Sequence, residues 1–113
     1  MQRAFVQANH DLVQRYVDAL VEASVALKKD KSGTVAILKK YFQSDDDHAM
    51  QVAYDFYASE VVQPLPYPKP EQFKDAIDQL SVTNPKVHDI DLGKLLDTSF
   101  VQSAADRGLD KAN

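Results

Sequence analysis

Residues 10–28 read HDLVQRYVDALVEASVALK, and this stretch decides the fold class. Its apolar side chains recur at steps of three and four residues, the spacing of an amphipathic helix. Asn9 is a good N-cap, and Lys28 and Lys29 place positive charge at the C-terminus. Since the polar side chains form one narrow stripe, we expect burial on more than one side. The positions that recur at this spacing are Leu12, Val13, Tyr16, Val17, Leu20, Val21, Ser24 and Leu27, and the polar stripe is Asp11, Arg15, Asp18 and Glu22.

The same spacing continues toward the C-terminus and predicts helices over residues 31–42 and 45–62. Asp30 or Ser32 can cap the first, and Ser44 with Asp47 three residues later resembles a capping box. The links between these helices are only a few residues long, which makes consecutive helices antiparallel neighbours. The expected inner faces are Val35, Leu38, Tyr41 and Phe42 in one helix and Met50, Ala53, Tyr54, Tyr57 and Val61 in the other.

Four prolines alternate in residues 63–70, QPLPYPKP, where the helical pattern breaks. Each proline fixes its own φ and pushes the preceding residue toward an extended conformation. This predicts an extended connector over residues 63–69, held against the body by Leu65 and Tyr67. A ligand for a proline-recognition domain is the alternative interpretation.

Two further helices follow the connector. Pro70 suits the first turn of a helix over residues 70–81, with Phe73, Ala76, Ile77 and Leu80 on its inner face. After a short apolar turn at Leu92, Leu95 and Leu96, a last helix is expected over residues 98–107. Its expected features are Asp97 or Thr98 as cap, Phe100, Val101 and Ala104 facing inward, and Gly108 just after the end.

The chain is therefore expected to be all-α: about five helices with a proline-rich extended connector. Its 113 residues allow a single helical domain or fragment over residues 1–113, and only 3 glycines argue against a turn-rich sandwich or barrel. Residues 3–7, RAFVQ, are the one stretch that favours a short extended piece. Leu20→Ala is expected to behave as a core truncation and Asp18→Ala, on the polar stripe, to be nearly neutral.

Composition excludes several classes of function. The absence of cysteine excludes a disulfide framework, a thiolate metal site and a cysteine nucleophile. No apolar run approaches the roughly 20 residues of a membrane span. No signal pattern opens the chain, so the export signal of an exported parent protein would lie outside this sequence.

The formal net charge is −4, and it is unevenly spread. Residues 1–43 hold seven basic and four acidic side chains, and residues 44–113 hold six basic and thirteen acidic ones. We therefore expect no nucleic-acid partner. The lysine cluster falls at two helix ends, where lysines meet exposed carbonyls, and phosphate binding is the less favoured alternative. The lysine cluster consists of Lys28, Lys29, Lys31, Lys39 and Lys40.

No pattern predicts a catalytic, cofactor or metal site. His10, His48 and His88 have no partner histidine at a zinc-ligand spacing. Asp45–Asp47 are adjacent acids without the alternating ligands and glycine of a calcium loop, so helix N-terminal charge explains them better. No nucleophile elbow, phosphate loop or dinucleotide fingerprint is present, and we expect the chain not to be an enzyme. Aromatic residues at helical spacing are expected in the core rather than around a ligand.

Six segments, taken in order, resemble one family. They cover nearly the whole chain, from about residue 4 to residue 109, although His10 stands where the family commonly has proline. The segments are AFVQANHDLVQRYVDALVEA (4–23), ILKKYF (37–42), AYDFY (53–57), PYPKPE (66–71), FKDAIDQL (73–80) and LDTSFV (96–101). The family is that of solute-binding proteins of ABC importers, of the nitrate, sulfonate and taurine type that also includes thiamine-precursor binders.

The resemblance implies the helical C-terminal part of a two-lobed α/β periplasmic-binding-protein fold. It implies structural support of one lobe, with a small anionic or zwitterionic solute held mainly by upstream residues and the ABC permease as partner. The parent protein would be periplasmic or extracytoplasmic. No binding residue is carried over to this chain.

Two other interpretations remain open. A free-standing helical protein–protein interaction module is the main alternative, and an uncharacterised enzyme is a weaker one that would need a polar pocket. The apolar surface of the first long helix exceeds what four shorter helices can cover. We therefore expect a homodimer, with that helix or residues 4–6 at the contact.

Overall fold

The computed structural model of the chain describes residues 1–111, and these residues form helices, turns and irregular segments with no β-strand. The prediction of an all-α fold is confirmed. A π-helical turn spans Tyr57–Val61, and 3₁₀ turns span Pro70–Phe73, Pro85–Asp89 and Leu109–Lys111. The α-helices are α1 (Arg3–Ala8), α2 (His10–Lys29), α3 (Lys31–Phe42), α4 (Asp47–Phe56), α5 (Lys74–Ser81), α6 (Leu92–Leu95) and α7 (Ser99–Asp106).

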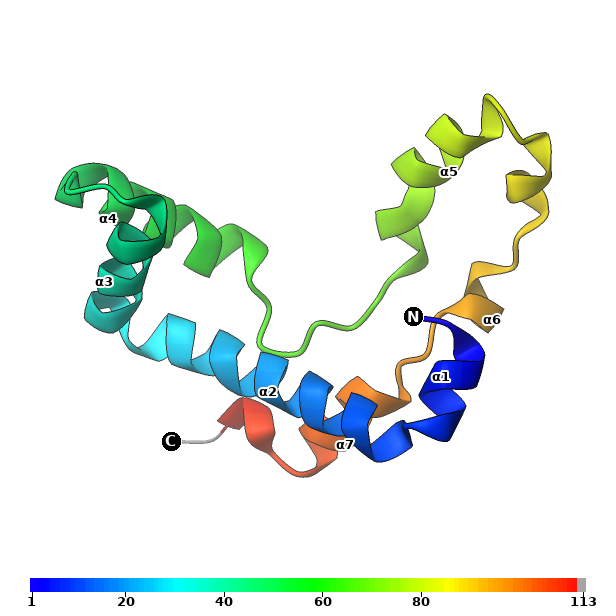
Figure 1. Cartoon of the computed structure of the whole chain (residues 1–113), viewed down its shortest axis with the longest axis horizontal. Coiled ribbons are helices and arrows are strands. Elements are labelled where there is room, and N and C mark those ends of the chain that lie inside the picture. Colours follow the sequence, from blue (N-terminus) through cyan, green and yellow to red (C-terminus); the bar gives the residue numbers. More distant parts are fainter. Residues whose placement is uncertain (112–113) are drawn as a thin grey trace.

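The molecule is an open U rather than a closed bundle (Figure 1). Helix α2 forms the base, α3 and α4 form one arm, and α5 with its neighbouring turns forms the other. The Cα radius of gyration is 17.5 Å, whereas a compact chain of this length has about 13 Å. The two arms therefore share no common core with each other.

The core lies where the end of the chain returns to its first long helix. Helix α7 packs along α2, and the side-chain amide of Gln14 donates a hydrogen bond to the Phe100 carbonyl at 3.0 Å. The guanidinium of Arg107 pairs with the Asp18 carboxylate at 2.5 Å. Asp18 lies on the polar stripe but is bonded to Arg107 and Gln14, so the structure does not support the expectation that Asp18→Ala is nearly neutral. The buried residues of these two helices are Val13, Val21 and Val25 of α2 and Phe100, Val101 and Ala104 of α7.

Helix α2 is buried on one side only, contrary to the prediction. Leu12, Tyr16 and Leu20 are 50%, 57% and 44% exposed, so the expectation of Leu20 as a core residue is wrong. The sequence periodicity correctly predicts that two faces of α2 are apolar. One of them stays uncovered because the arms diverge from α2 instead of folding over it (Figure 1).

The α3–α4 arm attaches to the C-terminal end of α2. The Tyr54 hydroxyl donates a hydrogen bond to the Lys28 carbonyl at 3.2 Å, and Lys31 pairs with Asp55 at 2.5 Å. The two helices contact each other, but Tyr41 and Phe42 are 78% and 67% exposed, so they do not form an inner face.

The cap predictions hold at some helix ends and fail at others. Asp30 caps α3 by accepting from the Gly33 amide at 2.8 Å, as expected. The predicted capping box of Ser44 and Asp47 does not form, because Asp46 caps α4 by accepting from the Ala49 amide. Gly108 follows α7 with φ +72°, the left-handed conformation that glycine adopts without strain.

The N-terminal prediction is also wrong. Residues 3–7 lie in α1 rather than in an extended piece, because the chain enters a short helix before α2. Asn9 sits between the two helices and its side chain donates to the Phe5 carbonyl at 3.0 Å. Asn9 thus occupies the N-cap position of α2, as predicted, but its side chain closes α1 and makes no cap bond to α2.

The proline-rich segment lies outside any helix and joins the two arms. Its backbone is extended at Val62 and at Lys69, and the Tyr67 hydroxyl donates to the Gln102 side chain of α7 at 3.0 Å. This bond ties the connector to the α2–α7 junction. Pro70 opens the next element, which begins as a 3₁₀ turn and becomes α5 only at Lys74.

Candidate functional site

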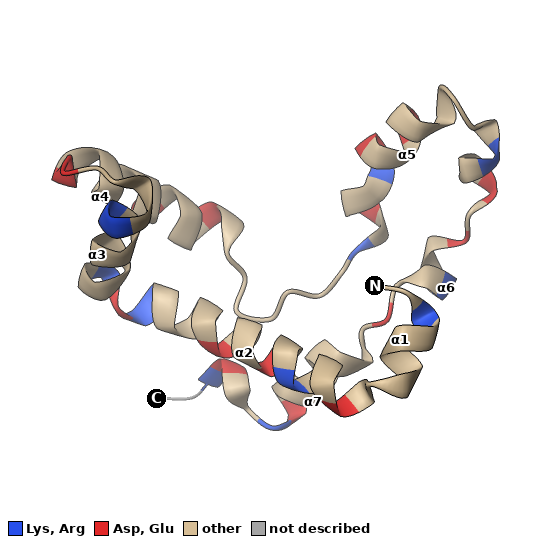
Figure 2. Ribbon diagram, viewed as in Figure 1, with Lys and Arg blue, Asp and Glu red and all other residues tan. Residues whose placement is uncertain are grey.

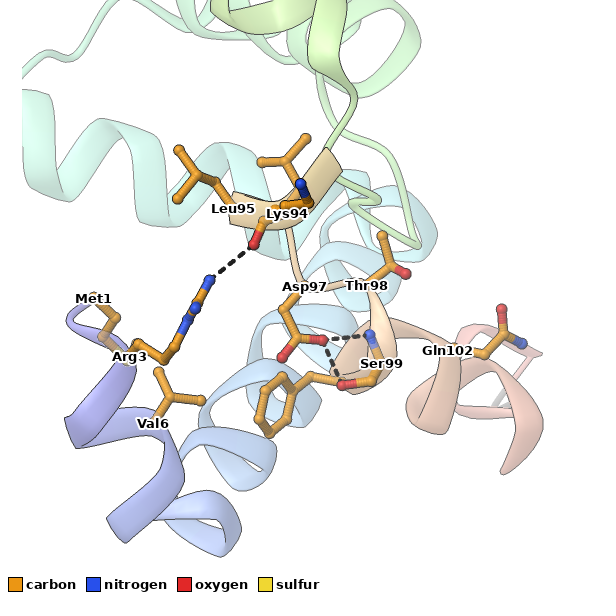
Figure 3. A pocket seen from close by; sticks show the side chains of 11 residues that line it. Met1, Arg3, Val6, Lys94, Leu95, Asp97, Thr98, Ser99 and Gln102 are labelled. Atoms are coloured by element: carbon orange, nitrogen blue, oxygen red, sulfur yellow. Dashed lines mark hydrogen bonds between the residues drawn. The ribbon is translucent and has the colours of Figure 1, made fainter. Parts of the chain in front are cut away.

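An open crevice of about 1030 Å³ lies between α1 and the α6–α7 segment. Figure 3 shows Arg3 and Val6 on one side and Lys94, Leu95 and Asp97 on the other. The Arg3 guanidinium Nη2 donates to the Lys94 carbonyl oxygen at 2.9 Å across the crevice. This bond joins residues 91 positions apart, so no local sequence signal could have indicated the crevice.

The polar centre of the crevice is the turn that starts α7. Asp97 Oδ1 accepts from the Ser99 hydroxyl at 2.6 Å and from the Ser99 amide at 3.0 Å. These two bonds lower the pKa of the Asp97 carboxyl, with a smaller contribution from the charge of His10 and against the opposing effect of burial. Asp97 and Thr98 are the two predicted caps of α7. The Thr98 side chain makes no cap bond, so Asp97 supplies the capping interaction.

This arrangement suits a structural junction better than catalysis. An activated serine needs an adjacent base that can take its proton, and bases work best with a pKa near the operating pH. The Asp97 carboxylate is held in its anionic form, with its pKa moved below the usual range, which makes it a weaker base. Its partner Ser99 uses hydroxyl and amide together to close the first turn of α7.

A second hollow of about 680 Å³ lies beside the connector. Glu60, Leu65, Tyr67 and Lys69 are among its lining residues. The Lys69 amide donates to the Gln72 side chain at 2.9 Å, which fixes the start of the following turn. Of the polar lining groups, the Tyr67 hydroxyl and the Gln72 side chain are already bonded within the chain and hold the connector and its C-terminal end.

The histidines and acidic clusters singled out in the sequence do not assemble into a site. Within residues 1–111, no group of three or more His, Asp or Glu side chains is placed to hold a metal ion. The His10 side chain is 66% exposed, and its ring lies 4.8 Å from that of Phe100. Of the adjacent acids 45–47, Asp46 caps α4 and Asp47 pairs with Lys39 at 2.8 Å.

The lysine cluster likewise does not converge on an anion site. Lys31 and Lys39 are paired with Asp55 and Asp47, and the Lys40 ammonium lies over the Tyr41 ring at 5.9 Å. In Figure 2 the basic residues are scattered among acidic ones along the U. Among the described residues, no helix is both long and apolar enough to cross a bilayer.

Exposed apolar surface is the most unusual feature that remains. The accessible surface is 8461 Å², about 2,300 Å² more than the roughly 6,200 Å² expected of a compact protein of 12.6 kDa. On α2 this surface forms a continuous row of exposed apolar side chains, called the α2 stripe below. The α2 stripe consists of Leu12, Tyr16, Ala19, Leu20 and Ala23.

Other exposed apolar residues lie on both arms. The prediction that the helical aromatic residues lie in the core holds for Tyr54 and Phe100, which are buried. It is wrong for six others, which are exposed: Tyr16, Tyr41, Phe42, Phe56, Tyr57 and Phe73. The largest exposures on the arms are at Ile37, Tyr41 and Phe42 on α3, Val52 and Phe56 on α4, and Leu80 and Val82 at the end of α5.

Comparison of the chain with protein-family models, with curated proteins and with solved structures found no match.

Proposed function

We propose that the chain is the C-terminal helical segment of an ABC-importer solute-binding protein of the nitrate, sulfonate and taurine type. In this role it supports one lobe of a two-lobed parent protein and holds no complete ligand site of its own. The parent protein would be periplasmic or extracytoplasmic, with a small anionic or zwitterionic solute and an ABC permease as partners. The segment itself would have no catalytic role.

The observation that carries the proposal is the open, uncovered shape, taken together with the ordered resemblance of six segments. A segment that packs onto another lobe has apolar faces prepared for that lobe. The excess exposed surface of about 2,300 Å² is what such a segment would leave open when it stands alone. The crevice between α1 and α6 offers backbone and side-chain groups that are already bonded to each other, in line with a solute held elsewhere.

Fragment complementation tests this proposal. A sulfonate- or taurine-binding protein of this family would be truncated before the region that resembles residues 4–109, and mixed with the present chain. We expect solute binding, measured by calorimetry, to appear in the mixture and to be absent from either part alone. Leu20→Asp places a charge on the α2 stripe and should lower complementation. The matched control is Gln79→Asp, which adds the same charge at an exposed position of α5 and should leave complementation unchanged.

Submillimolar solute binding by the chain alone would contradict the proposal, because it would require a complete site within these residues.

The second candidate function is a free-standing helical protein–protein interaction module. The exposed apolar residues on both arms favour it. Failure to complement several family members, with the chain folded, would favour this second candidate.

A further inference from the structure

The exposed area of the chain is large enough for a stable interface with a second copy. Stable protein–protein interfaces bury about 1,200–2,000 Å² in total, or 600–1,000 Å² per partner. The surface in excess of a compact protein is about 2,300 Å² per copy. This excess is spread over α2 and both arms, so α2 alone supplies only part of it, and we expect a weak dimer rather than a permanent one.

The α2 stripe is the part of this surface that is longest and most regular. Leu12 and Val21 are nine residues apart, about two and a half turns at 3.6 residues per turn, so they lie on opposite sides of α2. Tyr16 and Val25 have the same relation. Val21 and Val25 are buried, whereas Leu12 and Tyr16, on the opposite side of α2, are exposed.

We propose that two copies of the chain form a twofold dimer in which α2 packs antiparallel on α2 of the second copy through the α2 stripe. A twofold interface uses the same patch on both copies, and a straight apolar row on one long helix is self-complementary in this way. Ala19 and Ala23 lie beside the larger Tyr16 and Leu20, so that small residues leave room for large ones across the interface.

The charges beside the stripe fit this orientation. Arg15 and Glu22 are exposed and lie along one edge of the stripe. In an antiparallel pair centred between positions 18 and 19, Arg15 of one copy faces Glu22 of the second copy, and the reverse pair forms at the other end. Within residues 1–111, Arg15 takes part in none of the ion pairs or hydrogen bonds, so it is free for this contact.

Sedimentation equilibrium over a wide concentration range tests the dimer. We expect a monomer–dimer equilibrium for the native chain. Leu20→Asp should weaken dimerisation at least tenfold, because it places a charge at the centre of the interface. Leu80→Asp is the matched control, since Leu80 is 57% exposed on α5, away from the stripe, and this change should leave the dimer constant unaltered.

A charge exchange tests the register without touching the apolar contact. Arg15→Glu should weaken the dimer by about two- to tenfold, and adding Glu22→Arg in the same chain should restore it. Far-ultraviolet circular dichroism on each variant checks that the helices are intact. If Leu20→Asp unfolds the chain, the recovery of dimerisation in the Arg15→Glu, Glu22→Arg double variant still tests the interface.

A monomer at every concentration would overturn the dimer. A dimer that resists Leu20→Asp and weakens with Leu80→Asp would overturn the choice of α2. The inference does not rest on the proposed transport role, but both use the α2 stripe, so complementation is measured at concentrations where the chain is monomeric. A chain that is monomeric at every concentration and still complements a truncated solute-binding protein would refute the dimer alone. A chain that dimerises at high concentration and fails to complement as a folded monomer would refute the transport role alone.

Discussion

The two apolar faces of α2 differ in what covers them. One face meets α7, which lies about 86 residues further along the chain, where Gln14 reaches the Phe100 carbonyl. The other face carries the α2 stripe, and Leu12, Tyr16 and Leu20 remain about half exposed. The same helical periodicity produces both faces. An apolar pattern therefore indicates which residues can be buried. Which of them are buried depends on the distant segment that packs against the helix.

The largest expected effect is at the covered face. Phe100→Ala should lower the free energy of unfolding by about 3–5 kcal/mol, because it opens a cavity where α7 packs on α2. Leu20→Ala should cost less than about 1 kcal/mol, since much of this side chain is already in water. Urea denaturation at a concentration where the chain is monomeric measures both. Equal losses would mean that the two faces are equally covered.

A smaller effect is expected where the first arm joins α2. Tyr54→Phe removes the hydroxyl that donates to the Lys28 carbonyl, and should cost about 0.5–1.5 kcal/mol. Tyr41→Phe on α3 is the control, because Tyr41 is 78% exposed, and should lie within about 0.5 kcal/mol of the native chain. If the control costs as much as Tyr54→Phe, the hydroxyl does not anchor the arm.

The smallest effect is a pH dependence at the α2–α7 junction. The hydrogen bond from Arg107 lowers the pKa of the Asp18 carboxyl, assisted by the Gln14 amide and opposed by burial. A carboxyl with a lower pKa in the folded state stabilises the fold above its unfolded pKa of about 3.9 and loses this contribution as the pH falls further. Asp18→Asn should therefore flatten the acid limb of the stability profile.

Thermal melts between neutral pH and about pH 2 measure this effect. Asp11→Asn is the control, because the Asp11 side chain is fully exposed in the first turn of α2. An unchanged acid limb in Asp18→Asn, or the same flattening in Asp11→Asn, would show that the Asp18–Arg107 pair adds nothing to the folded state.

The sequence was sufficient for features that depend on local chemistry. The periodic stretch 10–28 corresponds closely to α2 (His10–Lys29), the Asp30 cap forms, and Gly108 adopts a positive φ after α7. These features follow from residues within a few positions of each other. The break at Pro64–Pro70 is local in the same sense, since each proline restricts only itself and its predecessor.

Features that depend on distant contacts could not be predicted. Leu20 and Val21 are adjacent and equally apolar in context, yet one is 44% exposed and the other is fully buried. The crevice bond from Arg3 to Lys94 and the pair of Arg107 with Asp18 join opposite ends of the chain. Periodicity carries no information on which distant segment returns to which face.

Leu20 and Val21 also provide the most direct test of the central claim. This claim is that one apolar face of α2 is covered within the chain and the other is exposed and available to a second copy. The chain contains no cysteine, so Leu20→Cys and Val21→Cys each create a single reactive site. We expect a thiol reagent at low protein concentration to modify the Leu20→Cys variant rapidly and the Val21→Cys variant slowly. Raising the protein concentration should slow modification of the Leu20→Cys variant only, because the dimer covers position 20. Equal protection at low concentration would contradict the account, because the α2 stripe would then be covered within a single chain.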